Sequence, residues 1–174
     1  MNNLVVKPPR DFNIKDGGAY MQSTSDGKRI LAVDDEPDVL ALLEEEIKQE
    51  WPNWTVEKAT TYEKANEMLK SNEYDLVILD IMGVKGFDLL DTAVSRKFRV
   101  AIFTARALSS EDLKRSYDAG AYAYIPKDKM GEMVSYLWVA LTYDREPGWR
   151  ELLGRLVGYF NDKFEPGWNR PLQG

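Results

Sequence analysis

Short apolar runs alternate with amphipathic segments through the middle of this 174-residue chain. Five runs have the length and composition of buried strands, the second being the weakest: 29–33, 55–59, 75–80, 100–103 and 121–125. Apolar residues recur at helical spacing in five further segments: 37–47, 62–69, 87–93, 109–119 and 130–143. This alternation predicts a parallel sheet with helices on both faces, a doubly wound α/β fold, and leaves the strand order open.

Both ends of the chain depart from this alternation. Residues 1–27 show no sustained period and contain Pro8-Pro9 and Gly17-Gly18, which favour a flexible N-terminal arm. We therefore expect the α/β domain to occupy residues 28–144 and a C-terminal helical extension to occupy residues 145–174.

The C-terminal extension carries one apolar stripe at helical spacing. Its members are Trp149, Leu152, Leu153, Leu156, Val157 and Phe160. Pro147-Gly148 is expected to break the chain before this amphipathic helix, and Pro166 is expected to end it. The stripe either folds back onto the α/β domain or forms a dimerisation or docking helix, because an exposed stripe of this size would promote aggregation.

The composition excludes several kinds of chemistry. The chain has no cysteine and no histidine, so disulfides, thiolate metal sites, cysteine nucleophiles and a phosphohistidine on this chain are ruled out. The net charge of −6, without a Lys/Arg cluster, argues against binding to nucleic acid or to an anionic membrane. Neither a signal peptide nor a membrane-spanning run is recognisable, so we expect a cytoplasmic protein.

Acidic and polar residues stand where the predicted strands end. Asp34-Asp35 follow the first strand, Asp80 closes the third, Thr104 follows the fourth, and Lys127 comes just after the fifth. The carboxyl ends of parallel strands share one edge of a sheet, so these side chains can converge there. Each residue alone is usually a turn former, a helix cap or a surface charge. Their joint occurrence indicates a site.

Carboxylates gathered in one cleft require a cation. Two unit charges about 4 Å apart repel by roughly 4 kcal/mol at an effective dielectric near 20. An all-oxygen site without histidine or cysteine favours Mg²⁺, whose open coordination positions can hold phosphoryl oxygens. A carboxylate can then act as the nucleophile and form an aspartyl-phosphate, while Lys127 and Thr104 supply a positive charge and a hydroxyl.

These residues resemble the receiver domain of response regulators in two-component signal transduction, over residues 28–143. The motifs that carry the resemblance are Ile-Leu-Ala-Val-Asp-Asp-Glu-Pro at 30–37, the strand at 75–80, Ile-Phe-Thr-Ala at 102–105 and Tyr-Ile-Pro-Lys at 124–127. The resemblance implies a flavodoxin-like sheet with strand order 2-1-3-4-5. It also implies phosphorylation by a histidine kinase or a histidine phosphotransfer protein, and signalling to an unknown downstream protein. Catalysis would be limited to the domain's own phosphorylation and dephosphorylation.

The resemblance also implies a role for individual residues. Asp80 matches the phosphoacceptor. The Mg²⁺ ligands would be Asp35 directly, Asp34 through water, Asp80, and the backbone carbonyl of Met82. Lys127 matches the lysine that pairs with the phosphoryl group, and Thr104 and Tyr124 match the switch hydroxyl and the switch aromatic.

The loop after Asp80 departs from the family pattern. Receivers usually have a Met-Pro pair in this loop and a glycine eight residues after the acceptor, whereas this chain lacks the proline and reaches Gly86 two residues early. A receiver-like interaction module that does not depend on phosphorylation is therefore the alternative function. A magnesium-dependent phosphatase of another α/β family is disfavoured, because such enzymes generally have an acid where Met82 stands.

Three smaller expectations complete the picture. Asp128 stands where the family often has proline, and the bulk of Met82 and Arg106 beside the path of the attacking water predicts slow loss of the phosphoryl group. Only about thirty residues follow the fifth helix, so we expect a stand-alone receiver without a DNA-binding output domain. A homodimer would form through the C-terminal helix or through the face made by the fourth helix, fifth strand and fifth helix.

Overall fold

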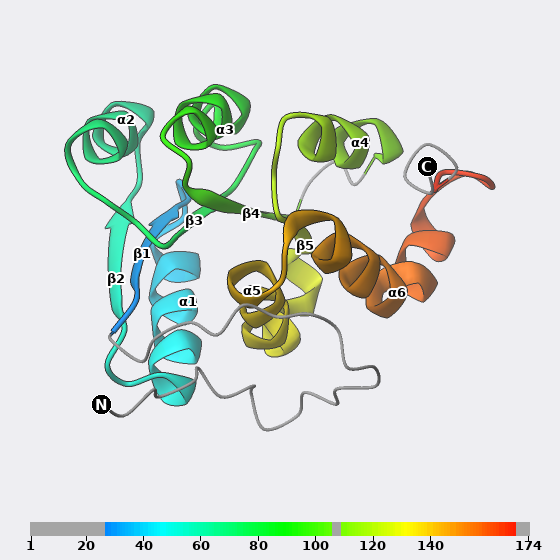
Figure 1. Cartoon of the computed structure of the whole chain (residues 1–174), viewed down its shortest axis with the longest axis horizontal. Helices are drawn as coiled ribbons and strands as arrows, with labels where there is room; N and C mark the ends of the chain where they lie inside the picture. Colours follow the sequence, from blue (N-terminus) through cyan, green and yellow to red (C-terminus); the bar gives the residue numbers. More distant parts are fainter. Residues whose placement is uncertain (1–26, 106–108, 170–174) are drawn as a thin grey trace.

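The computed structural model describes residues 27–105 and 109–169. Within these residues the chain forms a five-stranded, fully parallel sheet in the order β2-β1-β3-β4-β5 (Figure 1). The strands are β1 (Arg29–Val33), β2 (Thr55–Ala59), β3 (Leu76–Leu79), β4 (Arg99–Thr104) and β5 (Ala123–Pro126). The predicted doubly wound fold and the strand order 2-1-3-4-5 are confirmed.

Helices cover both faces of the sheet, with α1 and α5 on one side and α2, α3 and α4 on the other (Figure 1). Their bounds are α1 (Pro37–Glu50), α2 (Tyr62–Ser71), α3 (Gly86–Ser95), α4 (Ser110–Asp118), the 3-10 helix η1 (Lys127–Glu132), α5 (Met133–Thr142) and α6 (Arg145–Lys163). Local chemistry sets several starts: Pro37 begins α1, and the hydroxyl of Ser109 accepts a hydrogen bond from the Asp112 amide at the start of α4.

The interior strands are apolar on both sides because both faces of the sheet are covered. All four residues of β3 are buried, and so are four of the five residues of β1. The register pairs Val33 with Leu79, and Leu79 with Ile102, so β1, β3 and β4 end at the same edge of the sheet. The residues that follow these strands are thereby brought together.

The beginning of α6 differs from the sequence-based expectation. Pro147-Gly148 was expected to break the chain, but α6 begins at Arg145 and contains both residues. Proline is tolerated in a first helical turn, because an amide there has no partner within the helix. The chain turns instead at Tyr143-Asp144. At the other end, α6 stops at Lys163, before Pro166, as expected.

The α6 helix folds back onto the α/β core, beside β5 and α5. The residues buried by this packing are Trp149, Leu152, Leu156 and Phe160, whereas Leu153 is half-buried and Val157 is 39% exposed. The buried stripe is therefore narrower than the spacing of apolar residues predicted. Of the two alternatives for this helix, folding back onto the domain is the one that the structure has.

The predicted fifth helix differs from the structure, and some predicted features concern residues that the structure does not describe. The predicted helix at 130–143 begins within the 3-10 helix η1 and continues as α5, which ends at Thr142. The predicted N-terminal arm, apart from Gly27, and Arg106 lie outside the described residues. Within the described part of the chain, none of the helices combines the length and the apolar character needed to cross a membrane.

Candidate functional site

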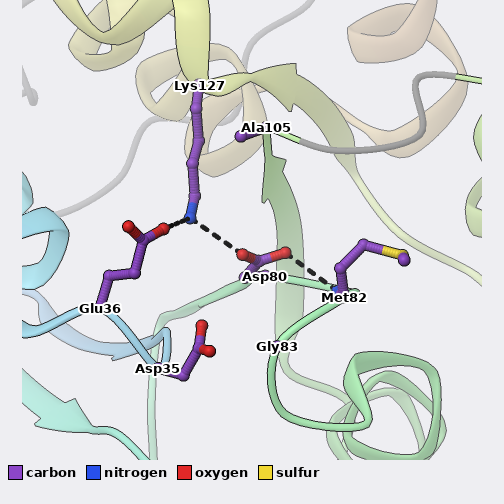
Figure 2. A pocket seen from close by; sticks show the side chains of 7 residues that line it. All are labelled: Asp35, Glu36, Asp80, Met82, Gly83, Ala105 and Lys127. Atoms are coloured by element: carbon purple, nitrogen blue, oxygen red, sulfur yellow. Dashed lines mark hydrogen bonds and ion pairs between the residues drawn. The ribbon is translucent and has the colours of Figure 1, made fainter.

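The carboxyl edge of the sheet gathers three carboxylates. Asp34 and Asp35 follow β1 and Asp80 follows β3, and one oxygen of each lies within 4.8 Å of the others. Asp35 and Asp80 line an open pocket, and Asp34 is buried. The other lining residues are Glu36, Met82, Gly83, Ala105 and Lys127 (Figure 2). Convergence of these residues from separate strands is the arrangement that the strand-end pattern predicted.

Lys127 supplies the positive charge at this edge. Its Nζ lies 2.7 Å from Asp34 Oδ2, 2.9 Å from Asp80 Oδ2 and 3.2 Å from Glu36 Oε1. Figure 2 shows the ammonium reaching down between Glu36 and Asp80. Burial by itself lowers the pKa of Lys127, but the hydrogen bonds to Asp34 and Asp80 outweigh burial and raise that pKa above its ordinary value. The lysine is therefore a fixed cation at neutral pH.

Asp34 is the most buried of the three acids. Only 1% of it is exposed, and its Oδ1 accepts a hydrogen bond of 3.0 Å from the Glu36 amide. Burial raises the pKa of Asp34, although Lys127 and the Glu36 amide act in the opposite direction. A carboxylate in this position is costly to ionise, so an additional cation in the pocket would stabilise its charged form.

Asp80 presents its carboxylate to the pocket with both oxygens engaged. Oδ2 binds Lys127, and Oδ1 accepts a hydrogen bond of 3.0 Å from the Met82 amide. The backbone amide of Asp80 donates to Val33 O, which ties the residue to β1. The contacts with Lys127, the Met82 amide and β1 thus fix the position of this carboxylate. The Met82 side chain, 51% exposed, lies beside it.

The shortened loop after Asp80 depends on two glycines. A Cβ added at Gly83 would lie 2.1 Å from Asp35 Oδ1, and a Cβ at Gly86 would lie 2.4 Å from the carbonyl oxygen of Asp80. The preceding Lys85 has a left-handed backbone with φ of 50°. Without side chains at the two glycines, the Asp35 carboxylate and the first turn of α3 can both approach the loop. The three carboxylates therefore stay together although the loop is short.

Thr104 and Tyr124 are buried and do not line the pocket. Thr104 is fully buried at the end of β4, opposite Pro126. Tyr124 on β5 is 1% exposed, and its hydroxyl has no hydrogen-bond partner among the described residues. Leaving a buried hydroxyl unpaired costs about 1–3 kcal/mol. Burial also raises the pKa of Tyr124, so the phenol stays protonated.

Sequence reasoning missed three participants in this region. Glu36, which continues the Asp34-Asp35 run at the end of the first strand, was given no role from the sequence, and its carboxylate is a third acid on Lys127. The steric role of Gly83 is a property of the folded loop. The hydrogen bond from the Tyr159 hydroxyl to Asp128 Oδ2, 2.9 Å long, joins residues 31 positions apart, and no local pattern announces it.

Comparison with known proteins identifies the family. The family of response regulator receiver domains matches residues 30–137, which is more than half of the chain. The chain therefore belongs to the response regulator receiver domain family. Receiver domains are signalling domains of two-component systems, bind Mg²⁺ through acidic residues, and interact with histidine kinases or phosphotransfer proteins.

Individual relatives agree with this assignment. A gliding motility regulatory protein of Myxococcus xanthus is 35% identical over 109 residues, which are 59% of this chain but 14% of that protein. A CheY-like receiver domain protein from Methanospirillum hungatei is 28% identical, with a TM-score of 0.52 over 62% of this chain and 94% of its own. The phosphorylated cyanobacterial phytochrome response regulator RcpA, at 20% identity, shares the fold with a TM-score of 0.57 over 64% of this chain and 91% of its own.

Proposed function

We propose that this receiver accepts a phosphoryl group on Asp80 from a phosphohistidine of a histidine kinase or histidine phosphotransfer protein, and signals through protein–protein contacts. One observation carries the proposal. Asp80 is 6% exposed, borders the open pocket, and is held by Lys127 within a cluster of three carboxylates. Such a cluster is unfavourable for stability on its own, and phosphoryl transfer is a reaction that uses it.

The acidic cluster also fits Mg²⁺. Its donors are carboxylate oxygens of Asp34, Asp35 and Asp80, the ligand type that Mg²⁺ prefers, and we assign the backbone carbonyl of Met82 as a further ligand. Lys127 already places one positive charge between Asp34 and Asp80, which supports the proposal that these carboxylates bind a cation. Bound Mg²⁺ would neutralise the carboxylates and orient phosphoryl oxygens for transfer.

The residues of this chain then act as follows. One oxygen of Asp80 attacks phosphorus, the P–O bond forms as the P–N bond to the donor imidazole breaks, and the imidazole leaves with its electron pair. Lys127 pairs with the charge on the phosphoryl oxygens. The hydroxyl of Thr104 turns toward the phosphoryl group, and Tyr124 changes position with it. The domain transforms no other substrate.

We further propose that residues 28–144 form the receiver unit and residues 145–174 an extension with its own role. The exposed side chain of Met82 lies beside Asp80, where it can hinder an attacking water molecule, so we expect a long-lived aspartyl-phosphate. Hydrolysis of the phosphoprotein within seconds would contradict this expectation.

Intact mass spectrometry tests the function directly. The full chain is incubated with Mg²⁺ and acetyl phosphate, beside an Asp80→Asn variant and a sample with excess EDTA. We expect the parent to gain one phosphoryl group and both controls to gain none. Absence of any gain in the folded parent, with several donors including a phosphorylated histidine phosphotransfer protein, would refute the proposal. The phosphorylation-independent interaction module would then be favoured.

A further inference from the structure

Two adjacent residues of η1 connect the acidic pocket with α6. Lys127 extends into the pocket, where it binds Asp34 and Asp80. The next residue, Asp128, accepts a hydrogen bond of 2.9 Å from the hydroxyl of Tyr159 on α6. A proline at position 128, which many receivers have, could not accept this bond. The departure from the family pattern at this position therefore creates a direct link from the pocket to the C-terminal helix.

A second link runs through β5. The ring centroids of Tyr124 and Phe160 are 6.4 Å apart, and both side chains are essentially fully buried. Phe160 is covered in turn by Phe164 and Trp168, at centroid distances of 5.0 Å and 5.2 Å. These rings form one aromatic cluster. It begins at Tyr124, whose hydroxyl has no hydrogen-bond partner among the described residues, and it ends at Trp168.

The start of α6 closes the surface between α4 and β5. Trp149 Nε1 donates to the carbonyl of Ala121 at 2.7 Å, and the Arg145 guanidinium donates to the carbonyl of Tyr117 at 2.9 Å. The rings of Tyr117 and Trp149 also meet edge to face. A helix of the same chain therefore covers this surface, beside α4 and β5 (Figure 1).

We propose that α6 is the output segment of this receiver: phosphorylation of Asp80 detaches α6 from η1 and β5 and exposes the surface around Tyr117, Ala121 and Tyr124. This inference rests on the proposed function and specifies its regulation.

The charges in the pocket set the direction of the change. The phosphoryl group of an aspartyl-phosphate carries about −1.5 to −2 units of charge at neutral pH, which is more negative than the ionised carboxylate of Asp80 by up to about one unit. Lys127 now divides its ammonium among Asp34, Glu36 and Asp80, and the phosphoryl group draws it away from the first two. Because Asp128 follows Lys127 in η1, a shift of this backbone misaligns the acceptor of Tyr159, and hydrogen bonds weaken steeply with misalignment.

The hydroxyl of Tyr124 favours detachment as well. It is buried beneath α6 without a partner among the described residues, which disfavours the docked helix. Once α6 has moved, water can reach this hydroxyl and satisfy it. The docked arrangement therefore carries a cost of about 1–3 kcal/mol that the detached arrangement avoids, which acts in the same direction as the perturbation at η1.

Hydrogen–deuterium exchange of the full chain tests the proposal. The parent is treated with Mg²⁺ and acetyl phosphate, and the phosphorylated fraction is measured by intact mass in the same sample. We expect the amides of α6 to exchange about tenfold faster after phosphorylation, within the usual range for coupling between two sites. The amides of α2, which lies at the opposite end of the sheet from α6 (Figure 1), should be unchanged, and so should the whole Asp80→Asn variant.

A matched pair of variants tests the route through η1. Tyr159→Phe removes only the hydroxyl that binds Asp128, and Tyr62→Phe makes the same change on α2. We expect Tyr159→Phe to raise α6 exchange before phosphorylation and to reduce the increase on phosphorylation to about threefold or less, while Tyr62→Phe behaves like the parent. An unchanged response in Tyr159→Phe would overturn the role of Asp128.

The outcomes separate this inference from the function on which it rests. A phosphorylated parent whose α6 protection stays unchanged would overturn the release of α6 and leave the phosphoacceptor role intact. A folded parent that gains no phosphoryl group would overturn both. A phosphorylated parent with selectively faster exchange in α6 would support both.

Discussion

The acidic pocket and the α6 interface lie on either side of η1 and are built in opposite ways. The pocket holds three carboxylates around one ammonium and closes over a short, glycine-dependent loop. The α6 interface consists mainly of aromatic rings, with few hydrogen bonds such as the buried one from Trp149 to Ala121. The first arrangement concentrates charge and the second excludes water, so the two contribute to stability with opposite sign.

Specific features of the pocket lower the stability of the fold. Asp34 is buried with a raised pKa, and Lys85 has a left-handed backbone that costs about 1–2 kcal/mol. Aromatic contacts such as those around Phe160 contribute about 0.5–1.5 kcal/mol per pair beyond the area they bury. Strain that gathers at one site in an otherwise well-packed fold is typical of functional residues. The pocket thus has the features of a reactive site, and the α6 interface has those of a stabilising one.

The largest expected effect comes from removing the centre of the aromatic cluster. Phe160→Ala should lower the free energy of unfolding by about 3–5 kcal/mol, because a fully buried ring is replaced by a cavity. Val157→Ala, a truncation on the exposed side of the same helix, should change it by no more than about 0.5 kcal/mol. Urea unfolding of the three proteins measures both values. Equal losses of unfolding free energy in the two variants would show that the buried and exposed sides of α6 do not differ in their contribution to stability.

A smaller effect should follow from removing the cation of the pocket. Lys127→Met leaves Asp34 and Asp80 without their shared ammonium, so we expect a loss of about 3 kcal/mol at pH 7. The pKa of Lys127 is raised in the fold above the ordinary value of 10.5. Its stabilising effect is therefore complete below pH 10.5 and is lost as the pH rises further.

The difference in the free energy of unfolding between the parent and Lys127→Met should therefore decrease above pH 10.5, by up to about 1.4 kcal/mol per pH unit. Unfolding curves at pH 9, 10.5 and 11.5 check this. Tyr74 and Tyr159, whose pKa values burial raises to about 12, titrate in both proteins and cancel in the difference. A gap that stays constant over this range would show that the ammonium is not held by the carboxylates.

Most of the fold could be predicted from the sequence because local and tertiary preferences agree. The apolar run at Leu76–Leu79 has one stable place, the middle of a sheet covered on both faces, and Ser109 caps α4 where the pattern placed a helix start. The predicted start of α6 was wrong, because proline breaks a helix in its interior but is tolerated in its first turn, where Pro147 lies. The docking of α6 depends on the shape of the surface formed by α4 and β5, which no local pattern encodes.

The site was partly predictable for the same reason. Parallel strands share one edge, so Asp34, Asp35, Asp80 and Lys127 could be brought together from their strand-end positions alone. Their roles in phosphoryl transfer and in the switch remain predictions. The contact between Gly83 and Asp35 and the bond from Tyr159 to Asp128 arise from three-dimensional packing between separate segments, and could be found only in the structure.

The smallest effect on stability is expected for Gly83→Ala. This variant tests whether Gly83, in the loop after Asp80, allows Asp35 to reach the position of a metal ligand. In Gly83→Ala, the new methyl group would stand 2.1 Å from the present position of Asp35 Oδ1 and would push the exposed carboxylate away from Asp34 and Asp80. We expect Mg²⁺ affinity, measured by isothermal titration calorimetry, to fall by about tenfold, as for other residues that orient metal ligands.

Gly154→Ala is the matched control, because a Cβ at this position of α6 meets no described atom within 4 Å. It should leave Mg²⁺ affinity unchanged and stabilise the helix by up to about 1 kcal/mol. The unfolding free energy of Gly83→Ala should stay within about 0.5 kcal/mol of the parent, because an exposed carboxylate can rotate away at little cost. Full Mg²⁺ affinity in Gly83→Ala would mean that Asp35 binds the metal from another rotamer. The tight loop would then serve only to close the turn into α3.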